Sequence, residues 1–136
     1  MLAVSFLIFV IMISGKQVVA YPDIELVQNF EEFNAKLTAN PNALLIITAR
    51  NCPACPPVLQ QVVDNCSKKK KVKCFWADIG DYNVANSFYD SEMLNVWWIP
   101  YVGFFKNGQK KAAANQGAAD KNSKNVNAGF RIYWLP

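Results

Sequence analysis

The stretch ALLIITARNCPAC, residues 43–55, joins an apolar run to a pair of closely spaced cysteines. Residues 43–49 are continuously apolar and rich in β-branched side chains, which is typical of a central strand buried on both faces. Cys52 and Cys55 follow directly, and residues 58–63 carry apolar side chains at helical spacing. This stretch therefore predicts a buried strand, a turn with two thiols, and a helix.

Strand and helix patterns alternate on both sides of this stretch. The expected strands are 25–27, 43–49, 72–79, 101–106 and 109–114. The expected helices are 30–37, one with an apolar stripe over 58–63 and a last turn at Lys68–Lys71, a loosely helical 82–94, and 120–133. The Asn107-Gly108 pair is a strong hairpin signal between the last two strands. The order predicts an α/β domain whose sheet becomes mixed at the final hairpin.

The composition limits the possible functions. The chain has 136 residues, of which 52% are hydrophobic and 18% charged, so it can bury the core of a single domain. It contains no histidine, which excludes a Ser-His-Asp triad and a His-ligated catalytic zinc within the chain. The net charge is +4, and five lysines lie within 68–73. This local cluster is not suited to following a phosphate backbone, so we expect no nucleic-acid partner.

The N-terminal segment has the pattern of a processing signal. Residues 2–13 form an almost unbroken apolar run, and Val18-Val19-Ala20 offers small residues for cleavage after Ala20. A transmembrane anchor is the alternative, but the run is shorter than the about 20 residues that a span needs. We expect a signal peptide over 1–20, a domain over 21–136, secretion or a secretory-pathway lumen, and no membrane partner after cleavage.

The two closely spaced cysteines carry the candidate chemistry. At a helix N-terminus, unpaired backbone N–H groups and the positive end of the dipole stabilise a thiolate. Cys52 would attack a disulfide, and Cys55 would resolve the mixed disulfide. A structural disulfide and half of a zinc site are the alternatives. Cys66 and Cys74 follow at a wide spacing that does not complete a zinc site, so we expect no metal.

The stretch WIPYVGFFKNG, residues 98–108, together with the Cys-Pro-Ala-Cys motif, resembles the thioredoxin superfamily over most of 21–136. The resemblance implies a thioredoxin-like fold with a central mixed sheet of four or five strands flanked by helices. It also implies a cis peptide bond before Pro100, against the Cys52 sulfur, and an Ile99 backbone that pairs with an extended substrate. Gly117 matches a glycine near the substrate groove. The cofactor expected is none beyond the redox-active disulfide.

The sequence departs from the superfamily pattern around the cysteines. Asn51 stands where thioredoxins have tryptophan, and Arg50 before it is either a thiolate-stabilising cation or a solvated loop residue. Ile46 replaces a buried aspartate that moves protons, which leaves water or another acid such as Asp78 to deprotonate Cys55. Tyr101 replaces a threonine after the cis-proline.

Pro56-Pro57 predicts an altered start of the helix. If the helix began at Pro53, Pro57 would lie past the first turn and remove a backbone hydrogen bond, so we expect a displaced or distorted start. The proline after Cys55 also favours an extended conformation for that cysteine. A later start would place the helix dipole further from Cys52 and weaken thiolate stabilisation.

Two further pairs leave alternatives open. We expect one ring of Trp97-Trp98 to pack in the core and the other, with Trp98 as the candidate, to form an apolar pad beside Cys52. Cys66 and Cys74 form either a structural disulfide, which an oxidising compartment favours, or two separate thiols.

The sequence thus predicts a thiol–disulfide oxidoreductase of the reductase, oxidase or isomerase type. It would act on disulfide-containing or thiol-containing polypeptides through Cys52 and Cys55. The alternative is a non-catalytic polypeptide-binding module in which Cys52 and Cys55 form an inert disulfide.

Overall fold

The computed structural model describes residues 9–13, 16–81, 83–114, 126–127 and 129–131. Its elements in chain order are β1 (Phe9–Ile13), β2 (Lys16–Ala20), β3 (Ile24–Leu26), α1 (Phe30–Ala39), β4 (Ala43–Thr48), α2 (Cys55–Lys68), β5 (Lys73–Asp78), α3 (Ser87–Asp90), β6 (Tyr101–Lys106) and β7 (Gln109–Ala114).

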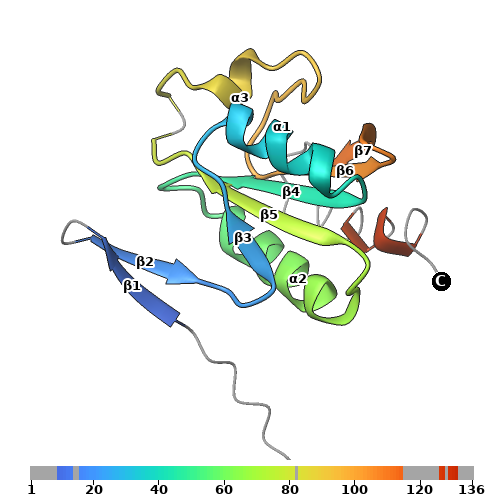
Figure 1. Cartoon of the computed structure of the whole chain (residues 1–136). Coiled ribbons are helices and arrows are strands. Elements are labelled where there is room, and N and C mark those ends of the chain that lie inside the picture. The colour runs from blue at the N-terminus through green and yellow to red at the C-terminus, as the bar shows by residue number, and fades with distance from the viewer. Residues whose placement is uncertain (1–8, 14–15, 82, 115–125, 128, 132–136) are drawn as a thin grey trace, which may run out of the picture.

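A five-stranded mixed sheet in the order β3-β5-β4-β6-β7 forms the centre of the domain. β3, β5 and β4 run parallel, and β6 and β7 are antiparallel to their neighbours. α1 and α3 cover one face of the sheet and α2 covers the other (Figure 1). The predicted α/β class, the mixed sheet and the final hairpin are confirmed.

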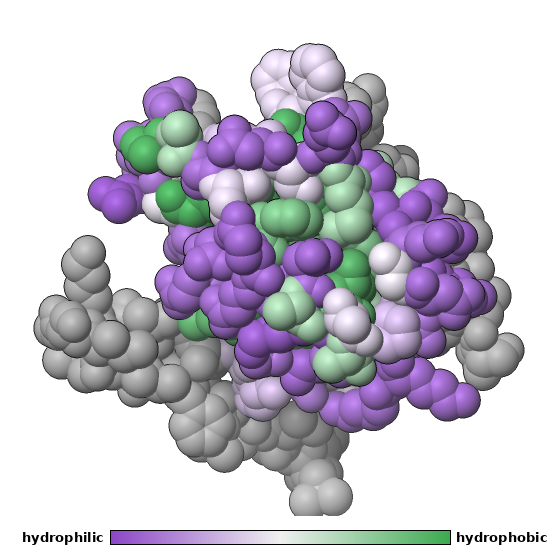
Figure 2. Space-filling view, turned by 45° about the horizontal axis from the view of Figure 1, so that its top comes forward, coloured by the Kyte–Doolittle hydropathy of each residue, from purple (hydrophilic) through white to green (hydrophobic). Residues whose placement is uncertain are grey.

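The core lies on both faces of β4, as its continuous apolar run predicts. Leu44 and Ile46 pack with α2, whereas Leu45 and Ile47 pack with α1 and α3. All six residues of β4 are buried, because side chains alternate between the two helix-covered faces. Figure 2 shows the side of the molecule with α1 and α3, where apolar side chains in the middle are surrounded by hydrophilic ones.

The segment after β5 is less helical than the sequence predicts. Among the described residues of this segment, 83–94, only the four residues of α3 form a helix. Asn86 begins it by accepting hydrogen bonds from the N–H groups of Phe88 and Tyr89, and Ser91 is extended at its end. The short helix with its non-helical flanks places the following residues, 95–100, near the start of α2.

The predicted C-terminal helix lies largely outside the described residues. Residues 126–127 and 129–131 are helical, and Val126 and Phe130 are buried on the α2 face of the sheet. The Phe130 ring meets the Phe104 ring edge-on at 6.0 Å. A Cβ at Gly129 would lie 2.3 Å from the Phe104 ring, so glycine permits this close approach.

The segment predicted to be a signal peptide contains the β1–β2 hairpin. The two strands pair antiparallel from Phe9 opposite Ala20 to Ile13 opposite Lys16, and the hairpin extends away from the main sheet (Figure 1). Whether residues 1–20 are removed stays a prediction. Within the described ranges, no helix is both long and apolar enough to cross a membrane.

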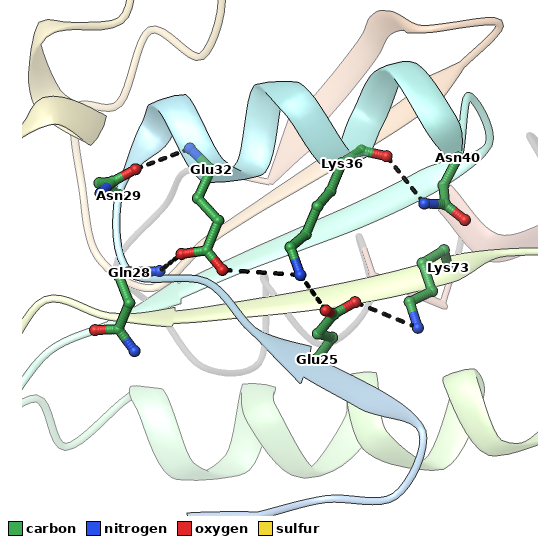
Figure 3. A network of polar contacts seen from close by, with 7 residues as sticks. All are labelled: Glu25, Gln28, Asn29, Glu32, Lys36, Asn40 and Lys73. Atoms are coloured by element: carbon green, nitrogen blue, oxygen red, sulfur yellow. Dashed lines mark hydrogen bonds and ion pairs between the residues drawn. The ribbon is translucent and has the colours of Figure 1, made fainter.

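A polar network fixes α1 to the edge of the sheet (Figure 3). The Lys36 ammonium binds the Glu25 carboxylate of β3, and Lys73 of β5 lies 3.4 Å from the same carboxylate. These cations lower the pKa of Glu25, chiefly through the hydrogen bond from Lys36. Asn29 caps α1 by accepting a hydrogen bond from the Glu32 N–H at 2.8 Å. The network therefore joins three elements at the outer edge of the sheet.

Candidate active site

The loop between β4 and α2 presents a disulfide at the end of the sheet. Asn51 has a φ of 57°, a left-handed conformation that asparagine tolerates better than tryptophan would. Cys52 follows, and the Cys55 N–H donates to the Cys52 carbonyl at 3.1 Å, which closes the turn. The two sulfurs form a disulfide. Cys52 is partly exposed, whereas Cys55 is buried with an exposed fraction of 4%.

The start of α2 lies after Pro53, as the prediction of a displaced start requires. The helix begins at Cys55, with Ala54 as its cap, rather than at Pro56 or Pro57. Cys55 is helical, so the expectation of an extended Cys55 is wrong. The two prolines lie in the first turn, where a helix has no internal partner for its N–H groups, and so they cost no hydrogen bond. However, they also remove two N–H donors from the helix end that faces the disulfide.

The peptide bond between Ile99 and Pro100 is cis, the geometry that the resemblance implies. Pro100 is buried, and the Ile99 carbonyl oxygen lies 3.9 Å from the Cys52 sulfur. The structure thus brings together Cys52, Cys55, Ile99 and Pro100 from two segments that are far apart in the sequence.

Both tryptophans before Ile99 are exposed, so the expectation that one of them packs in the core is wrong. The exposed fractions are 73% for Trp97 and 60% for Trp98. Residues 95–100 precede β6, so their side chains do not alternate between two faces as those of a strand do. Asn95, with a φ of 54°, turns the chain before the two tryptophans. The Trp97 indole donates to the Asn95 side chain at 2.7 Å.

Two open hollows flank Cys52. The first, of about 740 Å³, includes Tyr21, Thr48, Leu59 and Gln60 as well as both active-site cysteines in its lining. The second, of about 490 Å³, is mainly aromatic and aliphatic, and its lining includes Tyr89, Val96, Trp97, Trp98 and Ile99. Cys52 is therefore accessible from a more polar side next to α2 and from an apolar side next to the tryptophans.

The hollow beside Cys55 is not lined by Asp78, the acid considered from the sequence. The Asp78 carboxylate instead accepts a hydrogen bond from the Gly80 N–H at 2.9 Å. Ile46 is fully buried in the core. The polar group that sequence reasoning missed is Thr48, which is buried and accepts a hydrogen bond from the Trp76 indole at 2.8 Å. The sequence does contain a signal for this group, namely a hydroxyl side chain at the end of a strand whose other residues are apolar.

Arg50 belongs to the loop that contains Gly80. Its backbone N–H donates to the Gly80 carbonyl, and its guanidinium lies near Gly80. Arg50 is exposed and lines neither hollow. This position agrees with a solvated loop residue rather than a partner of the Cys52 sulfur.

Cys66 and Cys74 are bonded to each other, which decides between the two alternatives. Both are buried, and the bond joins the end of α2 to the start of β5. Within the described part of the chain, no three acidic, cysteine or histidine side chains are grouped to hold a metal ion. Gly117 lies outside the described residues.

No family model and no curated protein matches this sequence. Solved structures do match its fold. Thioredoxin O2 of Arabidopsis thaliana, in its oxidised state, is 21% identical, with 82% of this chain and 95% of that chain covered and a TM-score of 0.63. Thioredoxin O1 of the same plant is 24% identical over 81% and 97%, with a TM-score of 0.61.

Thioredoxin f2 of Chlamydomonas reinhardtii is 13% identical, covers 83% of this chain and 98% of that chain, and has a TM-score of 0.64. These similarities agree with the order of the strands in the sheet and with the position of the Cys52–Cys55 turn before α2. The chain has the thioredoxin fold.

Proposed function

We propose that this protein is a thiol–disulfide oxidoreductase that acts on protein disulfides through Cys52 and Cys55. One observation carries the proposal. Cys52 is partly exposed and its sulfur lies 3.9 Å from the Ile99 carbonyl oxygen, while Cys55 is buried. An attacking sulfur must be accessible, and a resolving sulfur must be close but shielded from substrate.

In the direction of reduction, the Cys52 thiolate attacks one sulfur of a substrate disulfide. The Cys52–substrate bond forms, and the first substrate thiolate leaves. The Cys55 thiolate then attacks the Cys52 sulfur, the second substrate thiolate leaves, and the Cys52–Cys55 disulfide forms. Two electrons pass from the protein to the substrate, and the two protons of the cysteine thiols end on the two substrate thiols. The disulfide is the only redox group that this reaction requires.

The Ile99 backbone supports a polypeptide substrate. Its carbonyl lies beside the reacting sulfur, where it can accept a hydrogen bond from the N–H of an extended chain. Trp98 lines the adjoining hollow and offers an apolar contact to the same chain. Disulfide-containing or thiol-containing polypeptides are therefore the proposed partners.

Reduction of insulin disulfides by dithiothreitol tests the proposal, with wild type compared to Cys52→Ser. We expect wild type to accelerate insulin precipitation and the variant to show the uncatalysed rate. Equal, uncatalysed rates for both would overturn the proposal. Cys55→Ser should accumulate a mixed disulfide between Cys52 and its substrate, detectable by mass spectrometry.

A second candidate function is a non-catalytic polypeptide-binding module with an inert Cys52–Cys55 disulfide. It is favoured by the two prolines, which remove N–H donors near the disulfide, and by the lining of the hollow beside Cys55, which includes no carboxylate. This module would bind an unfolded polypeptide equally well as wild type and as Cys52→Ser, with no change in the redox state of either partner.

The proposed location is the secretory pathway or the outside of the cell. The apolar run in 2–13 and the buried Cys66–Cys74 disulfide support an oxidising compartment. Expression of the full chain in a eukaryotic cell tests this proposal. Protein in the medium whose N-terminus follows Ala20 would support it, and retention of residues 1–20 in the cytosol would contradict it.

A further inference from the structure

The two ends of the sheet carry opposite charge. The parallel strands β4 and β5 end beside the active site, at Thr48 and Asp78. Five acidic residues of the described chain lie at this end, on the loops, α3 and the start of α1: Glu31, Asp78, Asp81, Asp90 and Glu92. Arg50 is a cation at this end, next to Gly80. As far as the structure describes the chain, the active-site end therefore carries more acidic than basic side chains, although the whole chain is basic.

The excess of lysines lies at the other end. Lys68 ends α2, Lys69–Lys71 follow in the turn, and Lys73 opens β5. Lys106 ends β6 beside Asn107, and the adjoining Gly108 N–H donates to the Pro41 carbonyl before β4. Among the described residues, most lysines therefore lie at a surface remote from Cys52.

Acidic side chains lie at the same end of the sheet as the apolar hollow beside Cys52, although none of them lines it. Tyr89 lines that hollow, and Asp90 follows Tyr89 at the end of α3. Glu31, Asp90 and Glu92 line a separate hollow of about 340 Å³. Burial and the charge of Asp81 raise the pKa of Tyr89, which places the Asp81 carboxylate in the same region. The Lys110 ammonium donates a hydrogen bond to the Leu94 carbonyl at 3.0 Å, in the segment that leads to the tryptophans.

The hollow itself is suited to an apolar side chain. Trp97 and Trp98 are both largely exposed although they are the most extensive apolar surfaces of the site. They line the hollow together with Val96 and Ile99, and Pro53 and Ala54 of the turn between the two cysteines line it as well. Exposed aromatic side chains that meet in a groove are typical of surfaces that bind a partner.

We propose that the disulfide substrates of this site are cationic polypeptides that carry an aromatic or aliphatic side chain next to the reacting cysteine. This inference rests on the proposed function. The apolar side chain occupies the hollow lined by the tryptophans, and lysine or arginine side chains of the substrate lie near the carboxylates at the same end of the sheet. Complementary charge raises the rate of encounter, and salt screens this effect.

Four short peptides test the proposal as symmetric disulfides: Lys-Phe-Cys-Lys, Glu-Phe-Cys-Glu, Lys-Ser-Cys-Lys and Glu-Ser-Cys-Glu, with blocked ends. The reduced full-length protein is mixed with each peptide, and the released thiol is measured in a single turnover. Each rate is divided by the rate of dithiothreitol with the same peptide, because flanking charge also changes the reactivity of the leaving thiol.

We expect the normalised rate for Lys-Phe-Cys-Lys to exceed that for Glu-Phe-Cys-Glu by about 10-fold at low ionic strength, with most of the difference lost in 0.5 M NaCl. The Phe peptide should react faster than the Ser peptide of the same charge. Trp97→Ala/Trp98→Ala should remove the preference for Phe, and Asp90→Asn/Glu92→Gln should reduce the preference for Lys.

Lys68→Gln/Lys71→Gln is the matched control, because it changes two exposed charges at the remote end. If the preference for Lys follows net charge rather than local charge, this variant will change it, and the proposal is overturned. Equal normalised rates for all four peptides also overturn it, while leaving the oxidoreductase function in place. Absence of exchange with every peptide and with oxidised glutathione, in wild type as in Cys52→Ser, would instead refute the proposed function.

Discussion

The ring of Tyr101 occupies space that Gly103 leaves open. Both residues belong to β6 and point to the face covered by α1 and α3. A Cβ at Gly103 would lie 2.9 Å from the hydroxyl oxygen and from a ring carbon of Tyr101. The Tyr101 hydroxyl donates to the Leu94 carbonyl at 2.9 Å. This pair therefore connects the strand after Pro100 to the segment that leads to the tryptophans.

Gly103→Ala should destabilise the fold, because the new methyl group would meet the rigid ring of Tyr101 in a closely packed core. We expect a loss of about 1–3 kcal/mol in the free energy of unfolding, measured with urea. A double-mutant cycle with Tyr101→Ala isolates the cause, since the alanine at 103 should cost less when the ring is absent. Full additivity of the two substitutions would contradict the proposed clash.

Alkaline pH should destabilise the protein through Tyr101. Burial raises the pKa of Tyr101 well above its ordinary value, so the folded state keeps the proton that the unfolded chain releases above about pH 10. The contribution of Tyr101 is complete below that pH and is lost as pH rises further. Urea unfolding at pH 8 and pH 11 should show a smaller alkaline loss for Tyr101→Phe than for wild type. An equal loss in both would rule out Tyr101 as the cause.

Acidic pH should weaken the network at Glu25 (Figure 3). The hydrogen bond from Lys36 lowers the pKa of Glu25, so this carboxylate stabilises the fold above its ordinary pKa and stops doing so as pH falls through the lowered value. Glu25→Gln should be slightly less stable than wild type at pH 7, and the two should converge as the pH falls below the lowered pKa of Glu25. The effect is small because the pair is partly exposed. Glu31→Gln, at an exposed position, serves as the control and should not change the acid dependence in this way.

Loss of the second disulfide should affect stability more than exchange chemistry. The Cys66–Cys74 bond closes a short loop, with a sequence separation of 8, at the end of the domain away from Cys52. Cys66→Ala/Cys74→Ala should lower the free energy of unfolding by about 2–3 kcal/mol under non-reducing conditions. At a temperature where the variant is folded, its exchange rate with oxidised glutathione should equal that of wild type. A lost exchange rate in the folded variant would give this bond a role in the reaction.

The fold was predictable because its signals are local and repeated. The apolar run of β4 and the Asn107-Gly108 turn each specify their structure through side-chain burial or backbone conformation. Asn107 and Gly108 both adopt the positive φ that such a turn requires. The dithiol position followed from the same pattern, since a turn after a buried strand lies at the end of the sheet.

The details of the site were not predictable from local patterns. The exposure of Trp97 depends on the turn at Asn95, which is a tertiary feature that strand periodicity does not describe. Thr48 lines the hollow, and its hydroxyl accepts a hydrogen bond from the indole of Trp76, which is 28 residues away in the sequence. Two effects of proline oppose each other at the start of α2. Proline disfavours a helical conformation for the residue before it, but the first turn of a helix accepts proline. The second effect is the larger one here, because the helix begins at Cys55.

Restoring backbone donors at the start of α2 should make Cys52 more reactive. Pro56 and Pro57 occupy first-turn positions whose N–H groups would otherwise point towards the dithiol. Pro56→Ala/Pro57→Ala returns two such donors, which favour the thiolate over the thiol. The reduced variant should therefore react faster than wild type with iodoacetamide at pH 7, and its Cys52–Cys55 disulfide should be reduced at a less reducing glutathione ratio. The same measurements on Pro41→Ala, a proline in the loop before β4, control for the general effect of losing a proline and should match wild type. If the double variant also matches wild type in both measurements, the missing donors do not limit the reactivity of Cys52.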